Sequence, residues 1–378
     1  MTKLTKLPRL LFLYSDTGGG HRSAVEAITE ALELEFPGQY SAEKVDFFKE
    51  YAPMPMKFAP EIYPIVSKNT RLWGMSYHLS DGKRQVNMMT RAAFPYFYTA
   101  CRRLLAEHPS DLVISVHPIM NTPVRQVVHR KHIPFVTVVT DMVSTHALWF
   151  DPQADLIILP TEIARERGRE LGIAEDKMVV CGLPVAAKFC LPPADKTQLR
   201  KQLDWPDSQL TLLLVGGGEG MGPLEATAAA IDNSGLPVSL IIIAGRNQRL
   251  KEKLESRDWK IPHRIYGFVS EMPEFMRAAD VLITKAGPGT ISEAFIAGLP
   301  IILYNRLPGQ EEGNVLYVIG EGAGTWAPEP GMVVSVIKNW INHPDRLAET
   351  TEASRSSARP DAARQIARLL MEKARKTA

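Results

Sequence analysis

Cysteine, net charge and long hydrophobic runs are all scarce in this sequence, and each absence excludes a class of protein. Its 378 residues include 3 cysteines, an odd number without Cys-x-x-Cys spacing. This usage argues against a disulfide-stapled fold and against a thiolate metal site, and it favours a reducing cytoplasm. A formal net charge of +2 gives no overall basic footprint for nucleic acid. We therefore expect a cytoplasmic protein that binds no nucleic acid.

No apolar run reaches the roughly 18 to 20 residues that a membrane-spanning helix needs. The longest runs have the length of strands, as in Leu210–Val215 and Leu240–Ala244. The amino terminus, MTKLTKLPRLLFLYSD, passes directly into a strand pattern without a small-residue cleavage site, so we expect no secretory signal peptide there. Any membrane association should therefore be peripheral.

Short apolar runs alternate with helix-like stretches along most of the chain. They predict strands first at Leu10–Tyr14, Leu112–Val116, Phe135–Thr140, Leu156–Leu159 and Met178–Val180. After Pro184 the pattern restarts, with strands predicted at Leu210–Val215, Ser239–Ala244, Arg264–Phe268, Val281–Thr284 and Ile301–Tyr304. This alternation is typical of parallel sheets covered on both faces. We expect an α/β protein of two Rossmann-like domains, 1–187 and 188–345, followed by a helical tail, 346–378, that can pack back on the first domain.

Residues 51–100 break this alternation, because aromatic residues, methionines and prolines crowd into them. The segment can be a helical cap that fills a gap in the core, since methionine and aromatic side chains are common core filler. It can instead be an apolar insertion that meets lipid, with Phe58, Trp73 and Tyr77 at the interface and cations facing anionic headgroups. The cations in and near it are Lys57, Arg71, Lys83, Arg84, Arg102, Arg103, Arg125, Arg130 and Lys131.

The stretch SDTGGGH follows the first predicted strand and opens a helix. Gly18, Gly19 and Gly20 permit a tight turn and close approach of a ligand, although their spacing fits neither a dinucleotide-binding motif nor a P-loop. His21 lies in the first helical turn, where the positive helix end disfavours the imidazolium and keeps the ring neutral near pH 7. The motif makes His21 a candidate general base, and a histidine that only bonds a neighbouring loop is the alternative.

Three loops of the second domain also follow predicted strands. LLLVGGGEGMGP repeats the order of strand, glycine loop and helix, and ITKAGPGTISEA places Glu293 one turn into a helix that opens on a glycine turn. The latter suits a diphosphate at the helix terminus and a carboxylate on a ribose diol. LPGQEEGN adds a polar cluster suited to sugar hydroxyls. Because carboxyl ends of parallel strands converge on one crevice, we expect a single ligand site there.

Together these stretches resemble monogalactosyldiacylglycerol synthases, the lipid galactosyltransferases of glycosyltransferase family 28, which also holds the MurG-type enzymes. The resemblance is carried, from about residue 10 to residue 320, by SDTGGGHRSAVEAI, TVVTDMVSTHALWF, GGGEGMGPLEATA, DWKIP, ITKAGPGTISEA and GQEEGNVLYV. It implies a GT-B fold, in which two Rossmann-like domains face a central cleft. It also implies inverting transfer of galactose from UDP-galactose to the 3-hydroxyl of 1,2-diacylglycerol.

The resemblance further implies roles for individual residues. His21 becomes the base on the acceptor hydroxyl beside the loop of Gly18, Gly19 and Gly20. Asp141 orients His21 or contacts the acceptor, and His146 is the runner-up base. The glycine turns hold the donor diphosphate, the backbone at 268–269 the uracil, Glu293 the ribose, and the 310–311 pair the hexose. The donor residues implied are Gly216, Gly217, Gly218, Glu219, Gly220, Arg246, Asn247, Phe268, Val269, Gly287, Pro288, Gly289, Thr290, Glu293, Gln310, Glu311 and Asn314.

A departing UDP carries charge that many glycosyltransferases meet with a divalent ion on an Asp-x-Asp motif, and this sequence contains no such triplet. Helix amino termini and backbone N–H groups can meet that charge instead, so we expect no catalytic metal and no cofactor. The implied partners are UDP-galactose or UDP-glucose, diacylglycerol and an anionic membrane surface on the inner face of the cell membrane. Two alternatives stay open: a diacylglycerol glucosyltransferase that uses UDP-glucose and can add several sugars in succession, and a nucleotide-sugar-binding protein without turnover.

Overall fold

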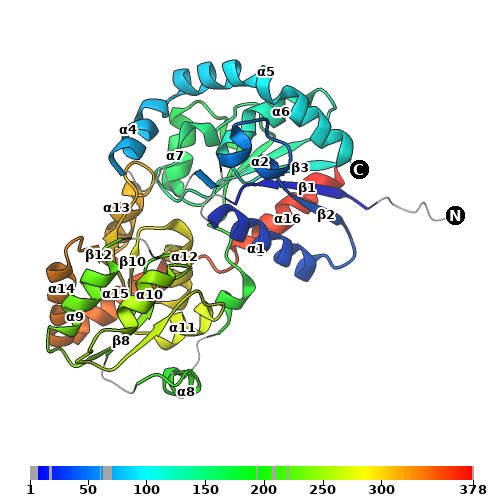
Figure 1. Cartoon of the computed structure of the whole chain (residues 1–378). Coiled ribbons are helices and arrows are strands. Elements are labelled where there is room, and N and C mark those ends of the chain that lie inside the picture. The colour runs from blue at the N-terminus through cyan, green and yellow to red at the C-terminus, as the bar shows by residue number, and fades with distance from the viewer. Residues whose placement is uncertain are drawn as a thin grey trace. The chain divides into compact units, whose positions relative to one another are not determined.

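The computed structural model describes residues 7–16, 19–59, 61–62, 70–192, 195–206, 210–218, 220 and 222–376. They fold into two compact units, which Figure 1 shows with their helices and strands. The first unit comprises Met1–Ala187, Leu307–Gln310 and Asp361–Ala378, and the second comprises Lys188–Arg306 and Glu311–Pro360. The tail predicted for 346–378 is therefore divided between the two units.

The first unit contains a six-stranded parallel sheet with strand order β2-β1-β3-β4-β5-β6. The strands are β1 (Arg9–Tyr14), β2 (Ser41–Asp46), β3 (Leu112–Ser115), β4 (Phe135–Val138), β5 (Leu156–Leu159) and β6 (Met178–Val180). Five of these were predicted from their apolar runs. The sixth, β2, lies at the sheet edge with four exposed residues, SAEK, so its sequence carries little hydrophobic pattern.

Helices cover both faces of this sheet, as predicted. Leu10 and Phe12 of β1 face a core cluster built with α1 and α16, while Leu11 and Leu13 face a second cluster on the other side. Burying each such side chain stabilises the fold by about 2 kcal/mol. The helices of this unit are α1 (Gly20–Glu35), α2 (Phe47–Glu50), α4 (Thr70–Ser80), α5 (Lys83–Glu107), α6 (Asn121–His129), α7 (Glu162–Glu170) and α16 (Ala362–Arg375).

Short 3₁₀ helices complete the first unit. They are η1 (Met56–Phe58), η2 (Pro118–Met120), η3 (Ala147–Trp149) and η4 (Glu175–Lys177), and η5 (Ala187–Cys190) begins at the last residue of the unit's first segment. Helix α16 packs along α1 (Figure 1), because its apolar residues recur at helical spacing and face the cluster that α1 shares. Arg368 of α16 also pairs with Glu35 at the end of α1, at 2.7 Å.

The second unit contains a parallel sheet of the same size, with strand order β12-β11-β10-β7-β8-β9. The strands are β7 (Leu210–Val215), β8 (Val238–Ile243), β9 (His263–Tyr266), β10 (Val281–Lys285), β11 (Ile301–Asn305) and β12 (Gly324–Trp326). The helices are α8 (Lys196–Gln202), α9 (Leu224–Asp232), α10 (Gln248–Glu255), α11 (Met272–Ala278), α12 (Pro288–Ala297), α13 (Glu312–Gly320), α14 (Pro330–Asn342) and α15 (Pro344–Ser356). Across the described ranges, no helix combines the length and the apolar character needed to cross a bilayer.

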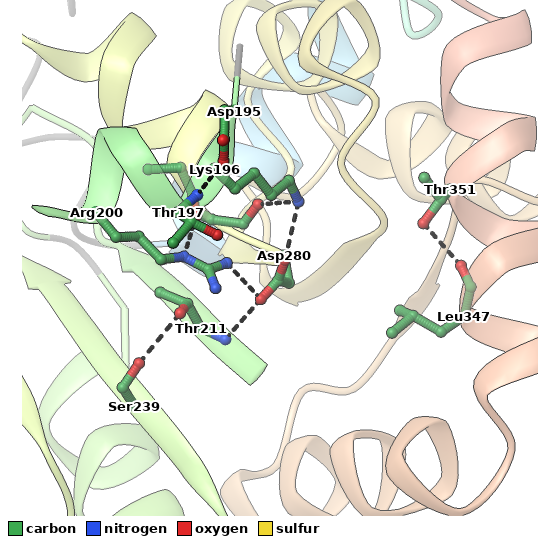
Figure 2. A network of polar contacts seen from close by, with 11 residues as sticks. Asp195, Lys196, Thr197, Arg200, Thr211, Ser239, Asp280, Leu347 and Thr351 are labelled. Carbon is green, nitrogen blue, oxygen red and sulfur yellow. Dashed lines mark hydrogen bonds and ion pairs between the residues drawn. The ribbon is translucent and has the colours of Figure 1, made fainter. Parts of the chain in front are cut away.

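A polar network closes the amino end of the second sheet. The Asp280 carboxylate accepts hydrogen bonds from Lys196 at 2.9 Å, from Arg200 at 2.6 Å and from the backbone N–H of Thr211 at 2.9 Å. Figure 2 shows this network. Asp195 caps α8 by accepting from the backbone N–H of Thr197 at 2.8 Å, which holds both cations in place. These bonds join α8 to the starts of β7 and β10.

Each sheet has one point where its strand order changes direction. In the first sheet β2 lies on one side of β1 and β3 on the other; in the second, β7 lies between β8 and β10. Ligands of open parallel sheets bind outside the carboxyl ends of the strands at such a point. The loops that follow β1, β7 and β10 are therefore the places where the fold positions functional side chains.

Candidate functional site

His21 lies at the carboxyl end of the first sheet, on the first turn of α1. The helix begins after Gly19, whose φ of 83° is a left-handed conformation that glycine adopts without strain. The imidazole is partly exposed, and its Nδ1 lies 2.9 Å from Oγ1 of Thr140, which follows β4. Gly19 and Gly20 both have open space where a side chain would begin, and Gly18 lies outside the described residues.

Although part of the His21 surface is exposed, the surrounding protein lowers the pKa of this imidazole to about 4, chiefly through burial, and a hydrogen bond with the Val116 backbone opposes the shift. The ring of His117 packs edge-on against that of His21, with 4.7 Å between centroids. The pKa of His117 is also lowered, first by burial and then by the charge that His21 would carry. Both rings are therefore neutral near pH 7, as a base requires.

Asp141 uses its carboxylate on other partners. Its Oδ2 accepts from Nε1 of Trp149 at 2.7 Å, and its Oδ1 accepts from Nε2 of Gln310 at 3.1 Å. The side chain is buried, with 7% of its surface exposed. The side chain that contacts Nδ1 of His21 belongs to the preceding residue, Thr140. Asp141 therefore follows the residue that contacts His21, while its own two oxygens bond Trp149 and Gln310.

His146, the runner-up base, is committed to structure on both ring nitrogens. Its Nδ1 accepts from the backbone N–H of Leu148 at 3.1 Å, which leaves the ring proton on Nε2, 3.1 Å from Oγ of Ser80. The ring packs against Tyr77 of α4, with 4.9 Å between centroids. A histidine whose acceptor nitrogen is occupied in this way is a poor candidate for a base, so the geometry favours His21.

The glycine loop after β7 packs tightly against the turn after β8. A Cβ on Gly220 would lie 2.4 Å from the Ala244 carbonyl oxygen, and one on Gly245 would lie 2.5 Å from the Gly218 oxygen. Gly216 is equally constrained by Gly220, at 2.8 Å. Only glycine fits such close backbone contact, so the loop presents main-chain groups at its surface. Glu219, predicted to belong to this loop, lies outside the described residues.

Three of the other predicted donor residues gather around this loop. The backbone N–H of Arg246 donates to the Gly218 oxygen at 2.8 Å, and its guanidinium lies 4.6 Å from the centre of the Phe268 ring. Phe268 is 62% exposed, so one aromatic face is held by a cation at the surface. Asn247 has a structural task, because its side chain caps α10 by accepting from the backbone N–H of Leu250 at 3.0 Å. Val269 follows Phe268 and is partly exposed.

Lys285, at the end of β10, is a functional candidate that the sequence reasoning missed. Its side chain lies between two of the predicted glycine turns: its Cε is 3.3 Å from a Cβ built on Gly217, and its Nζ is 3.2 Å from one built on Gly287. The ammonium pairs with Glu311 at 2.5 Å. The two glycine turns are predicted to hold a diphosphate. We expect a cation between them to attract that negative charge.

The turn after Lys285 leads into the amino terminus of α12, with Gly287 as its cap and Pro288 in its first turn. Gly289 has open space around it, and Thr290 is partly exposed. Glu293, one turn further, is partly exposed by surface area, yet the surrounding protein raises the pKa of its carboxyl to about 8 through burial, against a lowering by Lys188. A carboxyl in that range can both donate to and accept from a diol.

The predicted polar cluster LPGQEEGN divides into separate contacts. Glu311 bonds Lys285, whereas Gln310 bonds Asp141. Asn314 donates through Nδ2 to the Ala286 oxygen at 2.9 Å, and its buried Oδ1 has no hydrogen-bond partner within the described ranges. Among the residues whose positions are described, no group of three or more His, Cys, Asp or Glu side chains is arranged to hold a metal ion.

Known proteins match both units. Residues 21–185 match the family model for monogalactosyldiacylglycerol (MGDG) synthase, and residues 211–366 match the glycosyltransferase family 28 C-terminal domain. The chloroplastic monogalactosyldiacylglycerol synthase of Spinacia oleracea is 40% identical over 94% of this chain and 70% of its own length. This chain belongs to the monogalactosyldiacylglycerol synthase family. Chloroplastic monogalactosyldiacylglycerol synthase 2 of Arabidopsis thaliana is 37% identical over 93% of the chain and 78% of that relative.

Solved structures support the fold of this family member. A crystal structure of MurG from Acinetobacter baumannii superposes with a TM-score of 0.61 and covers 97% of this chain and 99% of the other, at 16% identity. A likeness at this identity bears on the fold alone. Together with the two parallel sheets it confirms the predicted α/β class of GT-B type, with two Rossmann-like domains.

The predicted location, in the cytoplasm on the inner face of the cell membrane, is wrong for this monogalactosyldiacylglycerol synthase family. Both relatives are named as chloroplastic. The prediction rested on cysteine usage and on the expected absence of a signal peptide. Cysteine usage reports the redox state around a chain, which does not distinguish one reducing compartment from another.

Proposed function

We propose that this protein transfers galactose from UDP-galactose to the 3-hydroxyl of 1,2-diacylglycerol, giving monogalactosyldiacylglycerol with inversion at the anomeric carbon. Its membership of a family whose relatives are named monogalactosyldiacylglycerol synthases supports the sugar and the acceptor. The observation that carries the chemistry is His21, a neutral imidazole at the carboxyl end of the first sheet with its Nδ1 bonded to a hydroxyl. With the ring proton on Nδ1 and donated to that hydroxyl, Nε2 is the nitrogen that can accept a proton.

The proposed step is a direct displacement. The acceptor oxygen attacks the anomeric carbon, its proton passes to Nε2 of His21, and the bond from that carbon to the diphosphate oxygen breaks, with its electron pair leaving on UDP. A positioned base contributes about 10²- to 10⁴-fold to such a rate. The inverted configuration follows from attack on the face opposite the leaving group.

The charge on the departing UDP is met, in this proposal, by the second unit. The amino terminus of α12 and the backbone N–H groups of the glycine turns supply partial positive charge, and Lys285 supplies a full one. Glu311 holds the Lys285 ammonium in place at 2.5 Å. Fixed donors of this kind stabilise developing charge without rearranging during the reaction, and they make a catalytic metal unnecessary.

The test is to incubate purified protein with diacylglycerol vesicles and either UDP-galactose or UDP-glucose, and to identify the glycolipid by mass and sugar analysis. We expect a monogalactosyl product from UDP-galactose. A glucosyl product alone would replace the donor in this proposal, and no glycolipid from either donor would contradict it.

His21→Ala is the variant that tests the base. We expect its turnover to fall by about 10²- to 10⁴-fold, while UDP still binds, because His21 belongs to the first unit and the glycine turns to the second. Turnover is followed with radiolabelled donor and UDP binding by calorimetry. An unchanged rate would remove His21 from its assigned role.

Diacylglycerol stays in the bilayer, so we also propose that the first unit docks on an anionic membrane surface through α4 and the adjoining half of α5. Large apolar side chains are exposed there, among them Leu72 at 55%, Met75 at 56%, Leu79 at 70% and Met88 at 69%. Exposed cations flank these apolar side chains. Arg125, one of the cations predicted to bind lipid, is instead buried and paired with Asp151 at 3.0 Å. Tyr77 is likewise turned inward, donating to the Ser144 oxygen at 2.5 Å.

Two leucines give this docking proposal a matched test. Leu79 on α4 and Leu316 on α13 of the second unit are both 70% exposed. We expect Leu79→Glu to weaken flotation with anionic vesicles, since it places a negative charge in the docking surface, and Leu316→Glu to leave flotation unchanged. Equal behaviour of the two variants, or equal binding to neutral and anionic vesicles at all salt concentrations, would contradict the proposal.

A further inference from the structure

We propose that Thr140 is the positioning residue of His21: its hydroxyl holds Nδ1 and thereby presents Nε2 as the base. This inference rests on the proposed function, in which His21 takes the proton of the acceptor hydroxyl. Neither the glycine motif nor the family resemblance assigns a role to Thr140. The contact that assigns one is the 2.9 Å separation between its Oγ1 and Nδ1 of His21.

The sheet order explains why these two residues meet. His21 follows β1, and Thr140 follows β4, while β3 lies between these strands and ends beside Val116 and His117. The imidazole therefore extends along the carboxyl ends of the strands, past the end of β3, to reach the residue two positions beyond β4. Thr140 is 6% exposed, so its hydroxyl is fixed by its surroundings and not free to turn into solvent.

The position of the ring proton decides what the hydrogen bond between Thr140 and His21 does. A neutral imidazole carries one N–H, and a threonine hydroxyl can either donate or accept. If Nε2 is to accept the proton of the substrate, the ring proton must be on Nδ1, and Oγ1 of Thr140 must then accept it. The opposite arrangement, with Thr140 donating to Nδ1, would leave the proton on Nε2 and the ring unable to act as a base toward the acceptor.

A hydroxyl positions the ring without adding charge. A carboxylate on Nδ1 would stabilise the imidazolium and raise the pKa of His21, whereas Thr140 is neutral. The neighbouring Asp141 has both oxygens engaged, by Trp149 and by Gln310. The other groups that face the imidazole are the neutral His117 ring, the Trp149 ring, 5.9 Å away between centroids, and the backbone of Val116, whose carbonyl accepts from a ring N–H. The lowered pKa of His21 is consistent with this uncharged setting.

The chain offers a matched set of variants. Thr140→Val removes the hydroxyl and keeps the shape, and Thr140→Ser keeps the hydroxyl. Thr137→Val, on β4 itself, makes the same change at a fully buried threonine whose Oγ1 has no hydrogen-bond partner within the described ranges. We expect Thr140→Val to lower kcat on the order of 10²-fold with an unchanged KM for the UDP-sugar, and both other variants to keep most of the activity.

Nitrogen-15 NMR of histidine-labelled protein determines the tautomer of the His21 imidazole independently of any activity measurement. We expect the His21 signals, assigned by their loss in His21→Ala, to show an Nδ1–H tautomer in the wild type and in Thr140→Ser, and a mixture or the Nε2–H form in Thr140→Val. An Nε2–H tautomer in the wild type, or Thr140→Val that matches Thr137→Val in rate and tautomer, overturns the inference while leaving the proposed function intact. A fully active His21→Ala removes His21 as the base, and the inference with it, whereas wild-type protein that makes no glycolipid from either donor overturns the proposed function.

Discussion

The two ends of the second sheet use charged side chains in opposite ways. At the amino end, the Asp280 carboxylate accepts from Lys196, Arg200 and the Thr211 backbone, and the network satisfies itself (Figure 2). At the carboxyl end, glycine turns expose backbone, and buried acceptors such as Oδ1 of Asn314 have no hydrogen-bond partner within the described part of the chain. A buried polar atom without a partner is costly, so the Asn314 oxygen is a candidate acceptor for a donor group of a ligand at the carboxyl end.

Each end of the second sheet contains a lysine paired with an acidic residue, so the two ends can be compared through the same kind of ion pair. Lys196 lies 2.9 Å from Asp280 and Lys285 lies 2.5 Å from Glu311. Lys196 also donates to the Ala279 oxygen at 2.6 Å, so its role is to join α8 to the start of β10. Lys285 instead lies between two glycine turns. The same kind of ion pair therefore joins elements of the fold at one end, and at the other it lies between the turns that the proposed function assigns to the diphosphate.

Exchanging these two lysines for methionine should give the largest contrast. In Lys285→Met we expect kcat/KM for the UDP-sugar to fall by about 10²- to 10³-fold, because one fixed donor to the leaving diphosphate is lost. In Lys196→Met we expect the thermal midpoint to fall and the rate per folded molecule to stay unchanged. Steady-state kinetics and calorimetry on the same samples measure both quantities.

Lys285→Arg serves as the control for charge. It keeps a cation beside Glu311, so it should recover part of the lost rate. Lys285→Met also leaves the buried Glu311 carboxylate without this cation, so a lower thermal midpoint is expected there as well. The rate is what separates the two ends: if Lys196→Met loses as much activity as Lys285→Met, the distinction between a closed end and a ligand end fails.

The strands of this fold could be predicted from the sequence wherever a strand is buried on both faces. The run LTLLLV of β7 is fully buried, and it reads as continuous hydrophobic sequence. The two strands that sequence reasoning missed, β2 and β12, are both edge strands; β12 has three residues, all partly exposed. Edge strands pair on one side only, so packing places few demands on their side chains and the hydrophobic pattern fades.

The candidate site was predictable where its geometry is local. A glycine turn that opens a helix shows in a few consecutive letters, which is why His21 and the turns of the second unit could be proposed. Thr140 and Lys285 matter through contacts far along the chain, 119 residues for His21 with Thr140 and 26 for Lys285 with Glu311. In the pattern TDMVSTH the acid Asp141 is the residue that sequence reasoning selects. The position of the β4 end shows instead that Thr140, the residue before Asp141, contacts the imidazole of His21.

Removing Asp280 tests the closed end with the smallest expected effect on chemistry. Asp280→Ala leaves Lys196, Arg200 and the Thr211 N–H without their common acceptor, so we expect the free energy of unfolding to fall by about 2 kcal/mol, discounted because Lys196 is partly exposed. Asp280→Asn keeps one oxygen as an acceptor and should lose less. Urea unfolding followed by fluorescence measures the loss, and kinetics at low temperature measure activity in the folded protein. A stable but inactive Asp280→Ala would mean that the amino end of the sheet contributes to catalysis. The hydrogen bonds of Asp280 argue against this, because they all go to groups within the network.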